Sequence, residues 1–157
     1  MEKVLLVIGE AAEVTDTLYP YYRVQEDGFA CVVAAPEKKR YHLVQHDRPD
    51  DWDITQETKG YNFTADIAFR DIVPEEYMGL ILSGGRAPEY IRYDEDLMNI
   101  TRHFATTGKP IAVVCHGIEI VAKAGVIRGK TVTTVAKCAF DAEVCGATYV
   151  DEPCVVD

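Results

Sequence analysis

Four short apolar runs constrain the fold of this chain more than any other feature of its sequence. They occupy residues 4–8, 29–35, 78–82 and 110–114. Runs this short, without polar alternation, are typical of strands that are buried on both faces of a parallel sheet. We therefore predict a sheet whose strands are mainly parallel and covered on both sides.

Helices are predicted in the segments that separate these runs. Each segment has apolar residues at helical spacing and is followed by a glycine, which favours a helix C-terminus. The helices are expected over residues 15–27, 94–107 and 118–124. The first run, the first helix and the second run form a strand–helix–strand unit, whose crossover is right-handed in parallel sheets.

Two other parts of the chain carry weaker patterns. Short strands are expected at residues 41–44 and 54–58, on either side of a turn over 46–51. Near the C-terminus we expect a short helix around residues 140–145. Short strands are expected there at residues 131–134, 148–150 and 154–156.

The order of these elements defines the expected fold class. Alternating strands and helices predict an α/β three-layer sandwich, in which a mainly parallel sheet lies between two layers of helices. The chain has 157 residues, the size of one ordinary domain. No repeat or linker divides it, so we predict a single domain over residues 1–157.

The charge balance and the cysteines restrict the compartment and the partners. Lys and Arg total 16 against 26 Asp and Glu, giving a net charge of −10, which disfavours nucleic acid and anionic membranes as partners. No apolar run reaches the roughly 20 residues of a membrane span, and the N-terminal run is too short for a signal peptide. The five cysteines form no C-x-x-C pair, which disfavours disulfides and zinc ribbons. We therefore expect a cytoplasmic protein.

Cys115 is the sharpest candidate for chemistry. Sites in open α/β sheets lie beyond the carboxyl ends of the strands, and three loops there hold most of the unusual polar residues: 9–16, 83–89 and 115–117. Cys115 follows a predicted strand and precedes a helix, the setting of a nucleophile elbow. The helix dipole beneath it is expected to favour the thiolate. The alternative is a buried, unreactive cysteine.

The residues around Cys115 support the reactive alternative. His116 adds a polarising side chain and a backbone N–H suited to an oxyanion hole. The elbow pattern G-x-nucleophile-x-G is half present, because Gly117 fills the second glycine position whereas Val113 occupies the first.

The loop over residues 83–89 offers further candidates. Gly84 and Gly85 either form only a tight turn or present backbone N–H groups to a developing oxyanion. Glu89 is either a catalytic group or a solvated acid at the start of a helix.

The first loop carries three acids, Glu10, Glu13 and Asp16. We expect at least two of them to act as helix caps. A carboxyl aimed at Cys115 would instead hydrogen bond to the sulfur, and its own pKa would rise. The residues themselves do not decide which of the three acids takes this role and which, such as Glu13, only supports it.

No metal site is expected. One stretch is rich in His and Asp, but its spacing matches no established ligand pattern, so we interpret it as a solvated loop. The stretch contains His42, His46, Asp47, Asp50, Asp51 and Asp53. The remaining cysteines are interpreted as packing residues: Cys31, Cys138, Cys145 and Cys154.

On these residues the chain resembles the ThiJ/PfpI superfamily, which contains intracellular cysteine peptidases, glyoxalases, deglycases and related stress proteins. The resemblance covers almost the full length and rests mainly on residues 82–89 (LSGGRAPE) and 111–117 (IAVVCHG). Residues 16–20 and 124–129 support it, and residues 61–64 are similar to the branch that includes plant glyoxalases.

The resemblance implies a flavodoxin-like sandwich of the class I glutamine amidotransferase type that uses no cofactor. Cys115 would be the nucleophile, with His116 as its partner. The backbone around Gly84, Gly85 and His116 would hold the oxyanion. In peptidase-like members the acid matching Glu89 reaches the histidine of an adjacent subunit, which implies a homo-oligomer with a shared active site.

Three departures from the family pattern stand out. Asp16 occupies the place of the usual glutamate and is one methylene shorter. Val135 occupies a position that often holds a His or Tyr, which removes a proton donor. Members usually continue with another strand and a terminal helix, so we expect either a truncated chain or a last face covered by another subunit.

Several functions fit these residues. We favour an enzyme that attacks small α-oxoaldehydes such as methylglyoxal through Cys115, because one compact domain offers no evident peptide groove. Hydrolysis of a peptide or other amide by the same thiolate is the closest alternative. A peroxide sensor that oxidises Cys115 and a catalytically inactive oligomeric scaffold are the other two.

Overall fold

A five-stranded parallel sheet forms the centre of the computed structural model, which describes all of residues 1–157. The strand order is β5-β2-β1-β6-β7. The strands are β1 (Lys3–Val7), β2 (Ala30–Ala35), β5 (Ile67–Ala68), β6 (Tyr77–Leu82) and β7 (Ile111–Val113). All four predicted apolar runs lie in this sheet, because continuous apolar strands are stable only where both faces are covered.

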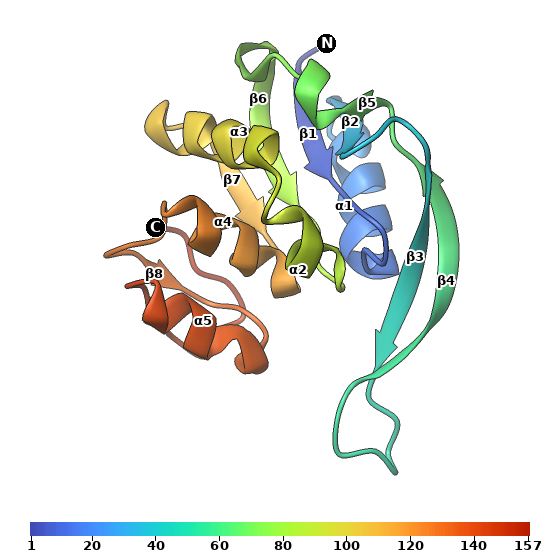
Figure 1. The fold of residues 1–157 in the computed structure, drawn as a ribbon, viewed down its shortest axis with the longest axis vertical. Helices are drawn as coiled ribbons and strands as arrows, with labels where there is room; N and C mark the ends of the chain where they lie inside the picture. The colour runs from blue at the N-terminus through green and yellow to red at the C-terminus, as the bar shows by residue number, and fades with distance from the viewer.

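Helices cover the sheet on both faces, which confirms the predicted three-layer arrangement (Figure 1). The long helix α1 (Val14–Glu26) packs on β1 and β2, and α3 (Glu95–Thr106) packs on β6. Beside α3 lie α4 (Ile118–Ala124) and the short helix α2 (Ala87–Ile91), which the sequence analysis did not predict. None of the helices has the length and hydropathy that crossing a membrane requires.

A long antiparallel hairpin leaves the sheet between β2 and β5. It consists of β3 (Arg40–Asp47) and β4 (Gln56–Thr64) and runs along one side of the molecule (Figure 1). Both strands are longer than predicted, and His46 and Asp47 lie in β3 rather than in a turn. Cross-strand pairing stabilises polar strands of this kind, and Tyr41 and Leu43 anchor β3 in the core.

The C-terminal part forms a small unit beside α4. It contains β8 (Thr131–Val132), α5 (Ala139–Val144) and β9 (Thr148–Tyr149), and the two strands pair in parallel. The prediction of a strand at residues 154–156 is wrong, since these residues pair with no strand. Instead the Asp157 carboxylate accepts a hydrogen bond of 2.6 Å from the Thr131 backbone N–H.

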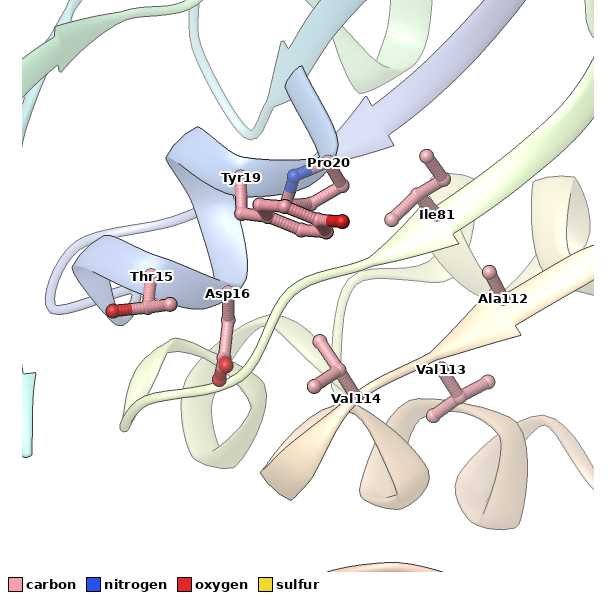
Figure 2. A pocket seen from close by; sticks show the side chains of 8 residues that line it. All are labelled: Thr15, Asp16, Tyr19, Pro20, Ile81, Ala112, Val113 and Val114. Carbon is pink, nitrogen blue, oxygen red and sulfur yellow. The ribbon is translucent and has the colours of Figure 1, made fainter. Parts of the chain in front are cut away.

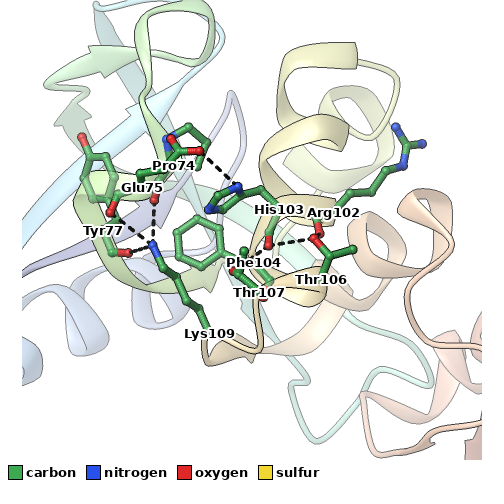
Figure 3. Close-up of polar contacts among 9 residues, drawn as sticks. All are labelled: Pro74, Glu75, Tyr77, Arg102, His103, Phe104, Thr106, Thr107 and Lys109. Atoms are coloured by element: carbon green, nitrogen blue, oxygen red, sulfur yellow. Dashed lines mark hydrogen bonds and ion pairs between the residues drawn. The ribbon is translucent and has the colours of Figure 1, made fainter.

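A lysine ties the end of α3 to the start of β6 (Figure 3). Lys109 Nζ donates to the backbone carbonyls of Pro74, Glu75 and Tyr77 at 3.2, 3.2 and 2.6 Å. Its ammonium also lies 5.5 Å from the centre of the Phe104 ring. These contacts fix where β6 begins, and β6 leads directly into the loop at residues 83–89.

Candidate active site

Cys115 lies at a sharp strand-to-helix corner, as the sequence predicts. It follows β7 and opens a turn of 3₁₀-helix, η3 (Cys115–Gly117), that continues into α4. Its backbone φ is +52°, one of only two positive values among the non-glycine residues. A side chain at Gly117 would come within 2.6 Å of the Leu82 carbonyl oxygen, so this position of the elbow requires glycine. Strained backbone of this kind is concentrated at functional sites.

Thr134 supports the corner and was missed by the sequence analysis. Its hydroxyl donates a 2.7 Å hydrogen bond to the backbone carbonyl of Cys115. Thr134 is 19 positions away in sequence, so no local pattern indicates this contact. The bond holds the unusual Cys115 conformation in place.

Asp16 reaches the nucleophile despite its short side chain. A Cβ atom at Gly84 would lie 2.3 Å from Asp16 Oδ2 and 2.7 Å from Cys115 Cβ, so both residues close on this glycine. Asp16 Oδ2 is buried and accepts no hydrogen bond of standard geometry. Glu13 caps α1 by accepting a 2.8 Å bond from the Asp16 N–H, so the expected cap role of Glu13 is confirmed.

The environment of Asp16 makes its carboxyl a weak acid. Burial, reinforced by the nearby charge of Glu13, raises the pKa of Asp16 to about 6. The Cys115 side chain and the Gly84 N–H favour the charged form and offset only part of this rise. At neutral pH Asp16 is therefore a carboxylate that readily accepts a proton.

In the free protein the surroundings of Cys115 favour the thiol over the expected thiolate. Burial raises the pKa of the Cys115 thiol, and the negative charge of Asp16 raises it further. The backbone N–H groups of His116 and Gly85 stabilise the thiolate but do not outweigh these two effects. The sulfur is therefore protonated at rest and sits beside a carboxylate that can take its proton.

His116 is the second group that contacts the sulfur. Its Nδ1 lies 3.3 Å from Cys115 Sγ, and the residue is 9% exposed. Burial lowers the pKa of His116, and the nearby Lys137 and His46 side chains lower it further. The ring is therefore neutral near pH 7 and able to accept a proton.

The backbone N–H groups predicted to form the oxyanion hole face two different side chains. The Gly85 N–H faces the Cys115 sulfur together with the His116 N–H. The Gly84 N–H faces the Asp16 carboxyl instead. The geometry thus places two N–H groups, from Gly85 and His116, where they can meet an oxyanion formed next to the sulfur.

His46 joins this cluster, although the sequence analysis assigned it to a solvated loop. Its ring centre lies 6.3 Å from that of His116 in an edge-to-face arrangement, and its side chain is 12% exposed. Its Nε2 lies 2.8 Å from Glu57 Oε2, and Arg86 Nε donates to the same oxygen at 2.8 Å. No local motif reveals this contact, because the long β3–β4 hairpin brings His46 to the site.

The remaining acids lie at the edge of the site. Glu89 is half-buried in α2 and its side chain makes no hydrogen bond within the chain, while its charge offsets part of the fall in the pKa of His116. Its role toward an adjacent subunit stays a prediction. Glu10 is exposed and pairs with His42 on β3.

An apolar hollow of about 280 Å³ lies next to Asp16. Figure 2 shows Asp16 projecting from the first turn of α1, with Tyr19 and Pro20 further along that helix. Cys115 does not line this pocket, whereas Val114, which is 38% exposed, does. We interpret the hollow as a part of the sheet surface near the edge strand β7 that no helix covers. We do not interpret it as the cavity in which the reaction takes place.

Comparisons with known proteins reveal close relatives. The model of the DJ-1/PfpI family matches residues 2–157. Deglycase TK1284 of Thermococcus kodakarensis is 34% identical over 99% of this chain and 85% of its own length. Deglycase PfpI of Pyrococcus furiosus is 32% identical over the same shares, 99% and 85%.

A solved structure agrees with the fold. A two-domain protein from Anabaena variabilis with DJ-1/ThiJ/PfpI-like and ferritin-like domains superimposes with a TM-score of 0.83 at 25% identity. The match covers 100% of this chain and 42% of that one. The predicted flavodoxin-like architecture is thereby confirmed.

Proposed function

Because this chain belongs to the DJ-1/PfpI family, as its motifs predicted, we propose that it is a cysteine-dependent enzyme of the deglycase type. Its substrates would be small α-oxoaldehydes and the adducts that these form with amines or thiols. The names of the two deglycases that match nearly the whole chain favour this activity over peptide hydrolysis and redox sensing. The observation that carries the proposal is the cluster of Cys115, Asp16 and His116.

The first step is attack by the sulfur on the aldehyde carbon. The Cys115 thiol gives its proton to Asp16, whose pKa of about 6 suits this transfer, as the C–S bond forms. The developing oxyanion meets the N–H groups of Gly85 and His116 and then takes a proton, which gives a hemithioacetal. When the substrate is an amine adduct, the C–N bond breaks and the amine leaves with the thiol proton.

The second step moves hydrogen between the two substrate carbons. Neutral His116 removes the proton from the former aldehyde carbon, the neighbouring carbonyl oxygen takes a proton, and an enediol forms. The other carbon then takes a proton while the hydroxyl on the former aldehyde carbon loses one, which gives a hydroxyacyl thioester on Cys115. Water then releases the 2-hydroxy acid and the thiol. One carbon is oxidised and its neighbour reduced, so no external oxidant or reductant is needed.

Val135 stands where a proton-donating His or Tyr is often found, and His46 would take over the role of that donor. The pKa of Glu57 is lowered through its hydrogen bonds to His46 and Arg86, although burial opposes this shift. An ionised Glu57 can only accept, so Nε2 of His46 carries the hydrogen and Nδ1 is left free to exchange a proton. We assign His46 to proton transfer at the second substrate carbon.

Substitution of this histidine tests its role. His46→Gln is expected to lower kcat about 10- to 100-fold with little change in KM, because the proton transfer is lost but binding is not. His42→Gln is the matched control, since the His42 side chain is exposed on the same strand and pairs with Glu10. It should change kcat less than about twofold. Equal kcat values for the two variants would remove His46 from the mechanism.

The proposed activity is tested with methylglyoxal and with its preformed adduct to N-acetylcysteine. Enzyme-dependent formation of lactate from free methylglyoxal, followed by chromatography in a buffer without amines or thiols, is the expected result. With the adduct, lactate and free N-acetylcysteine should appear in equal amounts. If neither substrate yields lactate above the uncatalysed rate, the proposed function is wrong.

A further inference from the structure

Three potential metal ligands meet beside Cys115, and one of them is His116, the base of the second step proposed above. One donor atom from each of His116, Glu119 and Cys138 lies within 4.8 Å of the other two. All three residues are buried, with exposures of 9%, 7% and 2%. They come from η3, α4 and the end of η4 (Ala136–Cys138), so only the packing of the C-terminal unit on α4 brings them together.

The present contacts within this group are weak. Cys138 Sγ lies 4.0 Å from Glu119 Oε1, which is at the limit of a thiol hydrogen bond. The other oxygen of Glu119 accepts a 3.2 Å bond from Arg92, whose side chain is 31% exposed. Glu119 therefore has one oxygen fully engaged and one facing the cysteine with almost no partner.

We propose that His116, Glu119 and Cys138 form a binding site for a divalent zinc-type cation. Imidazole nitrogen, carboxylate oxygen and thiolate sulfur are the three ligand types that Zn²⁺ takes in proteins, and three protein ligands leave a fourth position for water. Ligand atoms around a tetrahedral zinc ion are roughly 3–4 Å apart, so shifts of about 1 Å would complete the site. A harder cation such as Mg²⁺ would not select sulfur.

The charges and the access route agree with a cation of this kind. Burial raises the pKa of the Cys138 thiol, so a cation that binds here has to displace its proton. The resulting thiolate and the Glu119 carboxylate would supply two negative charges, of which Arg92 offsets one. A surface hollow of about 170 Å³ is lined by Arg92, Glu119 and Asp141 and leads to the carboxylate. An ion can therefore reach Glu119 from solvent without passing the Cys115 side of the site.

The proposed cation site lies next to the reactive cysteine and not only in a structural part of the fold. His116 Nδ1 lies 3.3 Å from Cys115 Sγ, so a cation bound to this ring occupies the immediate neighbourhood of the reactive sulfur. The inference itself concerns binding and does not depend on the deglycase proposal.

Cobalt provides the direct test, because a thiolate bound to Co²⁺ gives an absorption band that oxygen and nitrogen ligands do not. The protein, stripped with a chelator, is expected to bind one Co²⁺ per chain with this band, and Zn²⁺ should displace it. Cys138→Ser should abolish the band, and Glu119→Gln should weaken zinc binding at least about tenfold in competition with a chromophoric chelator. Cys31→Ser is the control and should keep the band, since Cys31 lies in β2.

The outcomes separate this site from simple capture by the nucleophile. Retention of the band in Cys115→Ser supports the proposal, whereas its loss there and retention in Cys138→Ser would place the metal on Cys115 and overturn it. Absence of any thiolate band in the unmodified protein would also overturn it. If Cys138→Ser does not fold, as judged by circular dichroism, an unchanged zinc affinity in Glu119→Gln decides against the site.

Discussion

Replacing Cys115 by serine is expected to lower the rate of lactate formation from methylglyoxal by at least about a thousandfold. A serine hydroxyl is a far poorer nucleophile than a thiol, and the carboxylate of Asp16 is too weak a base to activate it. The unfolding temperature should change little, because the substitution exchanges one atom at a half-buried position.

The control for this prediction is Cys154→Ser, which alters an exposed cysteine far from the elbow and should leave the rate unchanged. Lactate formation measured over a range of enzyme concentrations distinguishes true turnover from slow chemical conversion. A Cys115→Ser variant that retains more than a tenth of the activity would show that the sulfur is not the nucleophile.

Asp16→Asn is expected to reduce kcat/KM about 10²- to 10⁴-fold, because an amide cannot accept the thiol proton. In the unmodified enzyme kcat/KM should fall as the pH drops below about 6, where Asp16 becomes protonated. The variant should lose this acid limb. Asp16→Glu provides the matched control, since it keeps the carboxyl that relatives place here, and it should recover much of the rate.

Asp16→Asn should also stabilise the fold at neutral pH. The pKa of Asp16 is raised from 3.8 to about 6 in the folded protein, so the folded state holds its proton where the unfolded chain has lost it. The contribution of Asp16 to the unfolding free energy is therefore complete below pH 4 and is lost as the pH rises to 6. At pH 7 the ionised Asp16 therefore lowers the unfolding free energy by about 1–2 kcal/mol, after allowance for solvent screening.

Thermal unfolding at two pH values measures this effect. Asp16→Asn should unfold at a higher temperature than the unmodified protein at pH 7, and the difference should shrink toward pH 4. A variant that is faster and less stable than the parent at pH 7 would contradict both parts of the argument. Together the two measurements identify Asp16 as a group retained for chemistry at the expense of stability.

The sequence by itself determined the parts of this protein that local physical preferences control. Continuous apolar runs become central strands because only a covered sheet buries them on both faces, and glycines end α3 and α4 because they accept the backbone turn. The corner at Cys115 followed from a strand that leads directly into a helix. The ThiJ/PfpI motifs then identified Asp16 and the glycine pair as its neighbours.

The predictions failed where contacts between residues distant in sequence determine the local structure or the protonation of a group. Residues 154–156 are apolar enough for a strand, yet they pair with no strand. Residues 46 and 47 were expected in a turn, yet β4 pairs with β3 as far as Asp47, and the hairpin carries His46 to His116. The helix dipole argued for a thiolate at Cys115, whereas burial and the charge of Asp16 favour the thiol.

Only the tertiary structure decided where protons reside and which side chains meet. A pKa depends on the water removed from a group and on the charges placed around it, and neither is encoded in the few residues on either side. The same holds for the meeting of His116, Glu119 and Cys138, which follows from the packing of the C-terminal unit on α4. Local sequence therefore specified the candidate nucleophile, and the packing of distant segments determined which groups surround it.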